Sequence, residues 1–236
     1  IENATIPWSG PPDWCQGYGF QFWMCRYNCF RGDGYAGQIA LMMPEQDLAV
    51  AITAGSGDIQ AELDAAYHAL INAVKHRALP EDSAALASLR ATEAGLRIAL
   101  APSPGPNVAF AAETYRMEEN RLGLLRVSLA PAASGVAVAL TLEFADRTAS
   151  FEAGFEADVR GRAALVYSEP LDLAARAAWA SAGALVVRVL PIGTPSCFTL
   201  DFGFDGNRLT YRQRTPIWFR HERLLDETAT GTRLAL

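Results

Sequence analysis

The feature that most constrains the fold is a succession of short β-like segments in the second half of this 236-residue chain. Each segment is rich in β-branched or aromatic residues, and turn signals such as Ser134-Gly135 and Asp205-Gly206-Asn207 separate them. The segments are Ala112–Met117, Leu122–Leu129, Val136–Phe144, Arg147–Phe151, Ala163–Tyr167, Ala177–Ser181, Leu185–Leu190, Cys197–Phe204, Arg208–Gln213 and Ile217–Arg220. Short strands at this spacing predict an antiparallel sandwich or a closed meander barrel.

The composition of the chain excludes several classes of protein. Half of the residues are hydrophobic and only 19% are charged, so the chain can bury a core and is globular. A formal net charge of -6 gives no electrostatic footprint for a phosphate backbone, and no nucleic acid partner is expected. The longest apolar runs fall short of the roughly 20 residues that span a bilayer. The opening residues lack the pattern of a signal peptide, and the sequence predicts no compartment.

The first half of the chain predicts three strands and a helix. The strands are expected at 18–24, 38–43 and 48–53. Asp58 is expected to cap a long amphipathic helix that runs to Arg77, and a shorter helix is expected over 81–90. The proline-rich stretch Pro102–Pro106 predicts a linker. The expected organisation is therefore a first domain over 1–79, a linker over 80–106, an all-β domain over 107–225 and a loose tail over 226–236.

The residues alone supply no complete catalytic or metal site. No serine is followed three residues later by a lysine, because Asn72 stands at that distance before the sole lysine, Lys75. A Gly-x-Ser-x-Gly nucleophile elbow is also absent from the sequence. The four cysteines and three histidines lack the spacing of a metal site, so neither a metal nor another cofactor is expected.

One glycine-rich stretch, Arg31–Gln38, stands out as a candidate binding segment. Its glycines allow a substrate or another backbone to approach the edge of a sheet closely. A plain hairpin turn is the alternative interpretation. The Arg-Gly-Asp tripeptide inside the stretch also matches an adhesion signal, but three residues are weak evidence.

Three stretches in this order, Gly17–Trp23, Gly32–Gln38 and Met43–Val50, resemble the C-terminal strands of the beta-lactamase-related serine hydrolases. That family includes class C beta-lactamases, penicillin-binding-protein-like carboxypeptidases and esterases. The resemblance covers about the first third of the chain and implies an α+β fold class. Antiparallel strands and a long helix from a beta-lactamase-like domain would then precede the all-β sandwich or barrel domain.

The resemblance also implies roles for individual residues. Gly32-Asp33-Gly34 stands where the family carries Lys-Thr-Gly or a variant of it, so the backbone N–H of Tyr35 would be an oxyanion-hole donor. Gly32, Asp33 and Gly34 would bind substrate. The family's cationic residue is missing at Gly32, and the neighbouring Arg31 would take its place in substrate binding.

The family's Ser-x-x-Lys and Tyr-x-Asn motifs have no match in the chain. The main hypothesis is therefore a C-terminal fragment of a serine hydrolase that cleaves esters, amides or peptides, and the fragment alone is predicted to be inactive. Its partners would be a missing N-terminal catalytic segment and a small-molecule or peptide substrate. The alternative is a non-catalytic binding or assembly module. If the missing upstream segment normally packs on the first domain, its removal uncovers an apolar face and a strand edge, which would favour self-association into a homo-oligomer.

Overall fold

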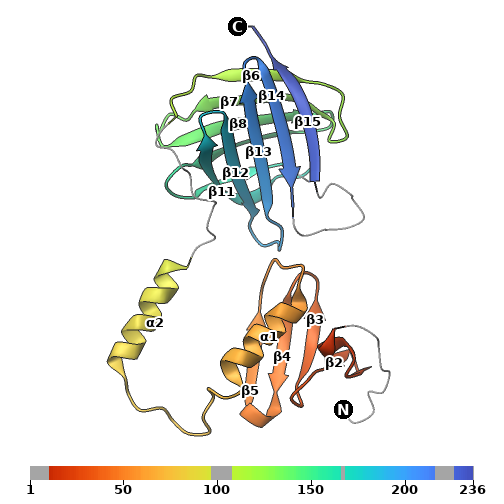
Figure 1. The fold of residues 1–236 in the computed structure, drawn as a ribbon, viewed down its shortest axis with the longest axis vertical. Coiled ribbons are helices and arrows are strands. Elements are labelled where there is room, and N and C mark those ends of the chain that lie inside the picture. Colours follow the sequence, from red (N-terminus) through yellow and green to blue (C-terminus); the bar gives the residue numbers. More distant parts are fainter. Residues whose placement is uncertain (1–10, 97–107, 166–167, 216–225, 236) are drawn as a thin grey trace. The chain divides into compact units, whose positions relative to one another are not determined.

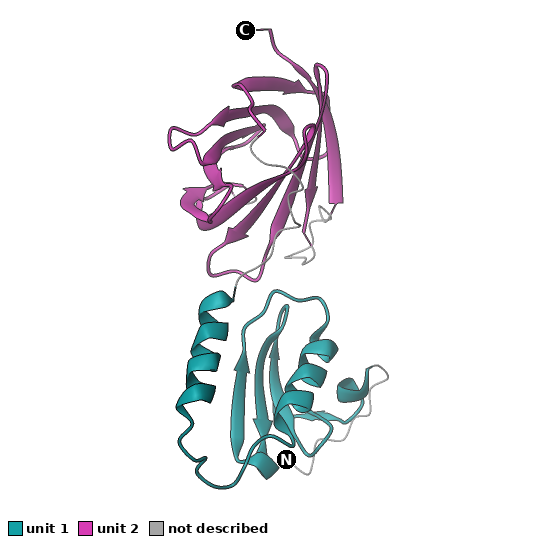
Figure 2. Ribbon diagram, turned by 60° about the vertical axis from the view of Figure 1, so that its left-hand side comes forward, with its two compact units in different colours: residues 1–97 teal, residues 98–236 magenta. Residues whose placement is uncertain are grey.

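The computed structural model describes residues 11–96, 108–165, 168–215 and 226–235. The chain divides into two compact units, residues 1–97 and residues 98–236, which are coloured separately in Figure 2. Two predictions fall outside the described residues: the linker stretch at 102–106 and the strand at 217–220.

Unit 1 is a small antiparallel sheet with helices. The sheet follows the chain order, because each strand pairs with the next one. Its elements are η1 (Pro12–Trp14), β1 (Tyr18–Gly19), β2 (Phe22–Met24), β3 (Phe30–Gly34), β4 (Gln38–Met43), η2 (Pro44–Gln46), β5 (Leu48–Ile52), α1 (Ile59–Leu70) and α2 (Ser83–Gly95).

Helix α1 covers one face of this sheet (Figure 1). Asp58 caps the helix by accepting a 3.0 Å hydrogen bond from the backbone N–H of Ala61. Leu63 and Tyr67 of α1 are buried against the inward side chains of β4, which alternate along the strand. The opposite face of the sheet presents small uncharged residues, and among them Ala40, Ala49 and Ala51 are exposed.

Several elements of unit 1 differ from the sequence prediction. The expected strand over 18–24 is two strands, because Phe20 and Gln21 adopt positive φ angles of 53° and 66° and form a turn. The expected long helix ends at Leu70 rather than Arg77. Strand β3 occupies part of the glycine-rich stretch and was not predicted as a strand.

In its described residues, unit 2 is a ten-stranded barrel whose consecutive strands pair antiparallel, while the closing pair β9–β11 is parallel (Figure 1). Its sheet order is β10-β11-β12-β13-β14-β15-β6-β7-β8-β9, and β9 also pairs with β11 at Gly154 and Arg176, which brings the two ends of the order together. The strands are β6 (Glu113–Met117), β7 (Leu124–Pro131), β8 (Ala137–Phe144), β9 (Thr148–Gly154), β10 (Val159–Ala163), β11 (Leu171–Ser181), β12 (Ala184–Pro191), β13 (Phe198–Asp205), β14 (Arg208–Arg214) and β15 (Asp226–Arg233).

The barrel interior is apolar. Alternate residues of each strand point inward, as in β12, where Leu185, Val187 and Val189 are completely buried. Large side chains such as Phe202 share this interior with alanines on β9, β10 and β11. The core of unit 2 is therefore a continuous apolar cluster.

The turn between β6 and β7 is organised by one asparagine. The amide nitrogen of Asn120 donates to the carbonyl oxygens of Glu118 and Leu124 at 2.7 and 2.8 Å. Its Oδ1 accepts from the backbone N–H groups of Leu122 and Leu124. Gly123 follows with a φ of 65°, a conformation that favours glycine.

The predicted fold class is wrong. The described chain is mostly β, a barrel plus a small sheet with two helices of 12 and 13 residues, and not an α+β fold built on a long-helix beta-lactamase-like domain. The tail expected over 226–236 also differs, since Asp226–Arg233 forms β15 within the barrel. None of the expected β segments covers β10, because the nearest one begins at Ala163, the last residue of this strand.

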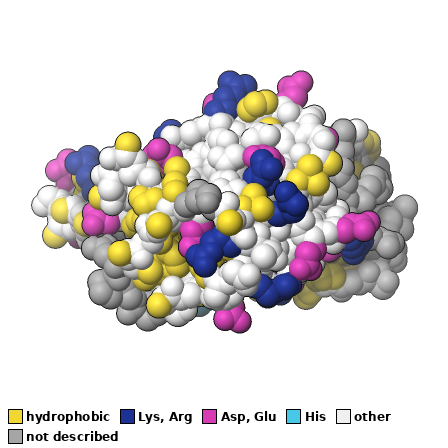
Figure 3. All heavy atoms as spheres, turned by 90° about the horizontal axis from the view of Figure 1, so that it is seen from above, with side chains coloured by type: hydrophobic (Ala, Val, Ile, Leu, Met, Phe, Trp, Pro, Cys, Tyr) yellow, Lys and Arg dark blue, Asp and Glu magenta, His cyan; other side chains and the backbone are white. Residues whose placement is uncertain are grey.

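Two observations concern partners. Within the described ranges, neither helix has the length and apolar character needed to cross a bilayer. Figure 3 shows acidic and basic side chains interspersed with apolar ones on one face of the molecule. That face therefore presents no extended charge of one sign.

Candidate functional site

Two of the predicted substrate-binding residues belong to the core of unit 1. Arg31 is fully buried, and its Nε and Nη2 donate to Oδ2 of Asp33 at 3.1 and 3.0 Å. Its Nη1 donates to the carbonyl oxygen of Asp13 at 3.0 Å and contacts Sγ of Cys25 at 3.1 Å. The guanidinium also lies over the ring of Trp14, 4.7 Å from its centre. Arg31 and Asp33 thus form a buried ion pair, and the hydrogen bond from Arg31 to Asp13 connects the sheet to η1.

The other predicted site residues lie at the β3–β4 hairpin. Gly34 pairs with Gln38, and a Cβ added to Gly34 would lie 2.9 Å from Cβ of Gln38. Gly32 pairs with Ala40. Tyr35 begins the turn, with 48% of its surface exposed. The structure therefore places the five predicted residues in one segment, but on two faces of the sheet. The roles of the glycines and of the Tyr35 N–H stay sequence-based predictions.

A buried carboxylate that the sequence analysis missed organises unit 1. The Asp13 side chain has no solvent exposure. It accepts hydrogen bonds from the backbone N–H of Arg26 at 2.8 Å, from Nη2 of Arg26 at 2.8 Å and from Nε2 of Gln60 at 2.6 Å. The hydroxyl of Tyr67 donates to it at 3.3 Å. Burial alone would raise the pKa of Asp13, but the hydrogen bonds from Arg26 and Gln60 outweigh it and lower the pKa.

The thiols of unit 1 are structural. Burial raises the pKa of Cys25, and burial together with the charge of Cys25 raises the pKa of Cys29 to about 11. Both thiols are therefore protonated at neutral pH and are weak nucleophiles. In the part of the chain that the structure describes, no three His, Cys, Asp or Glu side chains are arranged to hold a metal ion.

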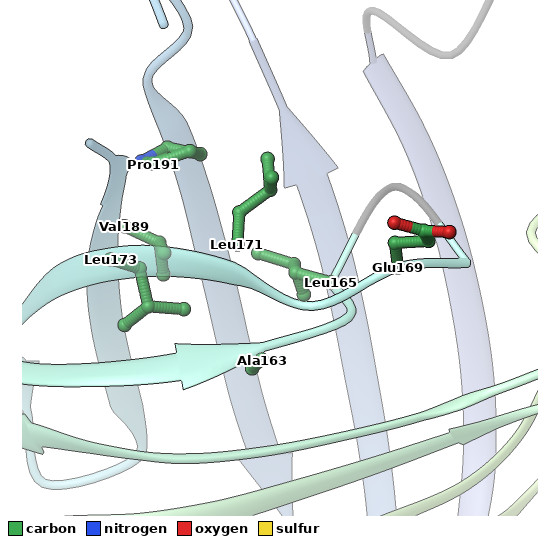
Figure 4. Close-up of a pocket in the computed structure, with 7 residues that line it drawn as sticks. All are labelled: Ala163, Leu165, Glu169, Leu171, Leu173, Val189 and Pro191. Atoms are coloured by element: carbon green, nitrogen blue, oxygen red, sulfur yellow. The ribbon is translucent and has the colours of Figure 1, made fainter. Parts of the chain in front are cut away.

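A pocket lies at the end of the barrel where β10 ends, β11 begins and β12 ends, and we call this place the barrel mouth (Figure 4). The pocket is shallow: its enclosed part has a volume of about 10 Å³, room for about one water molecule, and the figure of about 260 Å³ is reached only when the open solvent at its mouth is included. Six apolar residues and one carboxylate line it: Ala163, Leu165, Leu171, Leu173, Val189, Pro191 and Glu169. Glu169 is exposed at the rim. Four of the apolar residues belong to the interior cluster, so the pocket continues the apolar core.

Arg147, on the turn between β8 and β9, contacts the backbone of one residue of the barrel mouth. Its Nη2 donates to the carbonyl oxygen of Leu165, a pocket residue, at 3.2 Å. Its Cζ lies 4.1 Å from the ring centre of Phe144, and its Nη1 pairs with Oδ1 of Asp146 at 2.7 Å. Nε of Arg147 is buried and has no hydrogen-bond acceptor among the described residues. Arg147 is thus a largely buried cation that fixes the backbone next to the pocket without lining the pocket itself.

Two polar side chains of β14 lie inside the same unit. The hydroxyl of Tyr211 donates to Oε1 of Gln213 at 2.9 Å, and both residues are buried. Burial raises the pKa of Tyr211, while the positive charge of Arg147 acts to lower it. The tyrosine therefore stays neutral at physiological pH, and its hydrogen bond to Gln213 is intact.

The sequence carried a weak signal for Arg147. Ala149, Phe151 and Ala153 are the inward residues of β9, and the same alternation extended backwards points position 147 inward. The pocket itself could not be found this way, because its lining comes from strands β10, β11 and β12 and the connection after β10.

Comparison with known proteins assigns no family to the chain. No family model matches it, and no curated protein matches it. Among solved structures, a Schistosoma mansoni fatty acid binding protein in complex with arachidonic acid matches 52% of this chain and 94% of its own, with 8% identity and a TM-score of 0.39. Fatty-acid-binding protein 1 of Echinococcus granulosus matches 52% of this chain and 96% of its own, with 10% identity and a TM-score of 0.38.

A third match is the fatty acid-binding protein of Drosophila melanogaster brain tissue, with 8% identity and a TM-score of 0.38 over 52% of this chain and all of its own. At these TM-scores the likeness assigns neither a fold family nor a ligand to this chain. The resemblance to the beta-lactamase-related serine hydrolases is nevertheless wrong, as is the hydrolase-fragment function drawn from it, since the comparisons return fatty-acid-binding proteins instead. The missing catalytic segment is therefore no longer an expected partner.

Proposed function

We propose that unit 2 is a binding module that takes a small, mostly apolar molecule into the barrel mouth. The observation that carries this proposal is the apolar lining of the barrel mouth, which is interrupted only by Glu169 and continues the buried core. Concave apolar sites with a few polar groups are the usual form of small-molecule sites. This function corresponds to the binding module that the sequence left as the alternative to a hydrolase.

The driving force for such binding is burial of apolar surface. Each Å² of apolar surface removed from water contributes roughly 25 cal/mol, less the cost of fixing the ligand. A compact ring system or a short acyl chain would lie in the open part of the pocket, because the enclosed part has room for about one water molecule. Such a ligand would contact the side chains of Leu171, Leu173 and Val189 and keep any polar group toward the rim.

The test uses N-phenyl-1-naphthylamine, an uncharged probe whose fluorescence rises in apolar surroundings. We expect saturable binding of one probe per chain. Replacing Ala163, which lines the pocket, by leucine fills the space and is expected to weaken binding at least about tenfold.

The matched control is Ala174→Leu, on the outward side of β11. It adds the same side chain outside the barrel and is expected to leave the affinity unchanged. Thermal unfolding of both variants checks that the barrel remains folded. Unsaturable binding, or equal affinities for the two variants, would show that the probe does not occupy the pocket and would refute the proposal.

We also propose that the open face of the unit 1 sheet mediates self-association. Ala40, Ala49 and Ala51 make this face uncharged, and β5 is an edge strand of its sheet. We expect light scattering at micromolar concentration to detect a dimer or a larger species. Ala40→Glu should shift the population toward monomer, because burying an unpaired carboxylate in an interface is costly.

Ala61→Glu, on the exposed surface of α1, is the control and should leave the association unchanged. A natural chain that stays monomeric across the concentration series would contradict the proposed association.

A further inference from the structure

We propose that Cys25 and Cys29 form a disulfide across the β2–β3 hairpin when the chain meets a disulfide oxidant. Both thiols are free in the structure. The proposed modification is carried by the places of the two cysteines in the hairpin, opposite each other and on the same face of the sheet. It concerns unit 1 and does not depend on the barrel mouth.

The register of the hairpin places the two cysteines opposite each other. Met24 of β2 pairs with Phe30 of β3. One residue nearer the turn, the same register sets Cys25 against Cys29, and the backbone N–H of Cys25 donates to the carbonyl oxygen of Cys29 at 2.9 Å. Hydrogen-bonded residues opposite each other in an antiparallel pair have Cα atoms about 5.5 Å apart, which lies within the range that disulfides span.

The two side chains point to the same side of the sheet. Residues opposite each other on neighbouring strands share a face. Cys25 and Cys29 accordingly belong to one buried cluster with Leu63 and Tyr67 of α1, and they have 5% and 0% of their surface exposed. Burial and then the charge of Cys25 raise the pKa of Cys29, and the second cause requires the two sulfurs to lie near each other.

The oxidant is a small-molecule disulfide such as oxidised glutathione. Cys25 is the first nucleophile, because the guanidinium of Arg31, 3.1 Å from its Sγ, stabilises the thiolate. Its sulfur attacks one sulfur of the oxidant and forms a mixed disulfide, and the other oxidant sulfur leaves. Cys29 then attacks Sγ of Cys25 and releases the first oxidant sulfur.

The exchange is balanced. In each step the proton of the attacking cysteine passes to the sulfur that leaves, so the oxidant ends as two thiols. One disulfide forms, one breaks, and two electrons pass from the cysteine sulfurs to the oxidant. Because both cysteines are buried, the oxidant reaches them only when the hairpin opens, and the disulfide forms fastest while the chain refolds.

The disulfide would fix the turn that carries Arg26. This arginine lies between the two cysteines and donates to Oδ2 of Asp13 at 2.8 Å. The turn residues Tyr27 and Asn28 have positive φ angles of 59° and 55°, a conformation that few residues other than glycine adopt. A covalent link across the turn removes competing conformations from the unfolded chain. Unit 1 should therefore be more stable when the disulfide is closed.

The experiment first detects the link. The chain is unfolded in urea, refolded with reduced and oxidised glutathione, blocked with iodoacetamide and digested with trypsin. Trypsin cleaves after Arg26, between the two cysteines, so the disulfide joins the peptide that ends at Arg26 to the peptide Tyr27–Arg31. We expect mass spectrometry to find the linked peptides in the natural protein and in Cys15→Ser, and to find none in Cys29→Ser. The Cys15→Ser variant is needed because Cys15 lies in the first of the two peptides.

The second measurement is stability. In the Cys15→Ser chain, the oxidised form should have a urea midpoint about 1 M higher than the reduced form, as follows from closing so short a loop. Cys29→Ser is the matched control, and its midpoint should be the same with and without the oxidant. If Cys29→Ser does not fold, Cys25→Ser serves the same purpose.

Three outcomes would overturn the proposal. The first is refolding with excess oxidised glutathione that leaves no linked peptides, or that attaches glutathione to the two cysteines without linking them. The second is a link that disappears in Cys15→Ser, because Cys29 would then pair with Cys15. The third is a linked chain whose urea midpoint does not exceed that of the reduced chain, because the hairpin would then not fit the disulfide.

Discussion

Replacing Asp13 by alanine is expected to lower the stability of unit 1 by about 3 to 5 kcal/mol, the usual cost of removing one partner of a buried ion pair. The Asp13 side chain is completely buried, and its removal leaves donors of Arg26, Gln60 and Tyr67 without their acceptor. Since the free energy of unfolding of a domain is only about 5 to 15 kcal/mol, the variant's unit 1 should unfold at low urea concentration. Urea unfolding followed by tryptophan fluorescence measures the loss.

Asp64→Ala is the matched control, because Asp64 also pairs with Arg26 but is 54% exposed. Its loss should cost at most about 1 kcal/mol. Equal destabilisation by the two alanine variants would show that Asp13 does not organise unit 1. If the Asp13→Ala chain cannot be purified, Asp13→Asn is used instead, because it keeps the shape of the side chain and removes only its negative charge.

The same carboxylate predicts a pH dependence. The pKa of Asp13 lies below its ordinary value of 3.8 in the folded state, so the unfolded chain takes up the proton first. The stabilisation is therefore complete above pH 4 and is lost as the pH falls through the folded-state pKa. The slope of stability against pH in this acid range should be smaller in Asp13→Asn than in the natural protein.

Gly231→Ala is expected to destabilise the barrel by about 3 kcal/mol, at the upper end of overpacking costs. A Cβ at this position would lie 2.6 Å from Sδ of Met117 and 2.7 Å from the carbonyl oxygen of Arg116. Because the second neighbour is backbone, β15 and β6 must separate to relieve the clash. That pairing joins β6–β9 to β10–β15, so the barrel should open along this seam.

Gly203→Ala on β13 is the control, because its added Cβ would meet Thr210 at an ordinary 3.8 Å. This substitution should leave the stability of the barrel unchanged or raise it slightly, because alanine restricts the conformations open to the unfolded chain. Thermal unfolding by circular dichroism compares the two variants, and amide hydrogen exchange along β15 localises the effect. Similar melting temperatures for the two would contradict a tight β15–β6 contact.

The alternation of apolar residues made most barrel strands recognisable in the sequence. Strands β10 and β15 were missed because their outward residues are polar and their inward ones are small, as with Ala229 and Gly231. In unit 1, the turn at Phe20 and Gln21 was hidden because neither residue is one that normally favours positive φ. These errors come from tertiary context that a local pattern does not carry.

The candidate site was less accessible to sequence reasoning. Arg31 was expected to bind substrate, but the structure buries it between Asp33 and the backbone of Asp13, 18 residues away. The pocket forms only where β10, β11 and β12 meet around the barrel. Motif resemblance over a glycine-rich hairpin therefore pointed to the wrong family, and the roles that it gave to the hairpin residues stay predictions.

The pairing of β15 with β6 has a consequence for the order of folding during synthesis. Most other neighbours in the barrel are consecutive hairpins that can form as they emerge, whereas Arg233 reaches Glu113 across 120 residues. On the ribosome, the strands from β6 to β14 must wait for the last strand before the sheet can close. During that interval the apolar interior and two strand edges are exposed, and they are the surfaces a chaperone would have to shield.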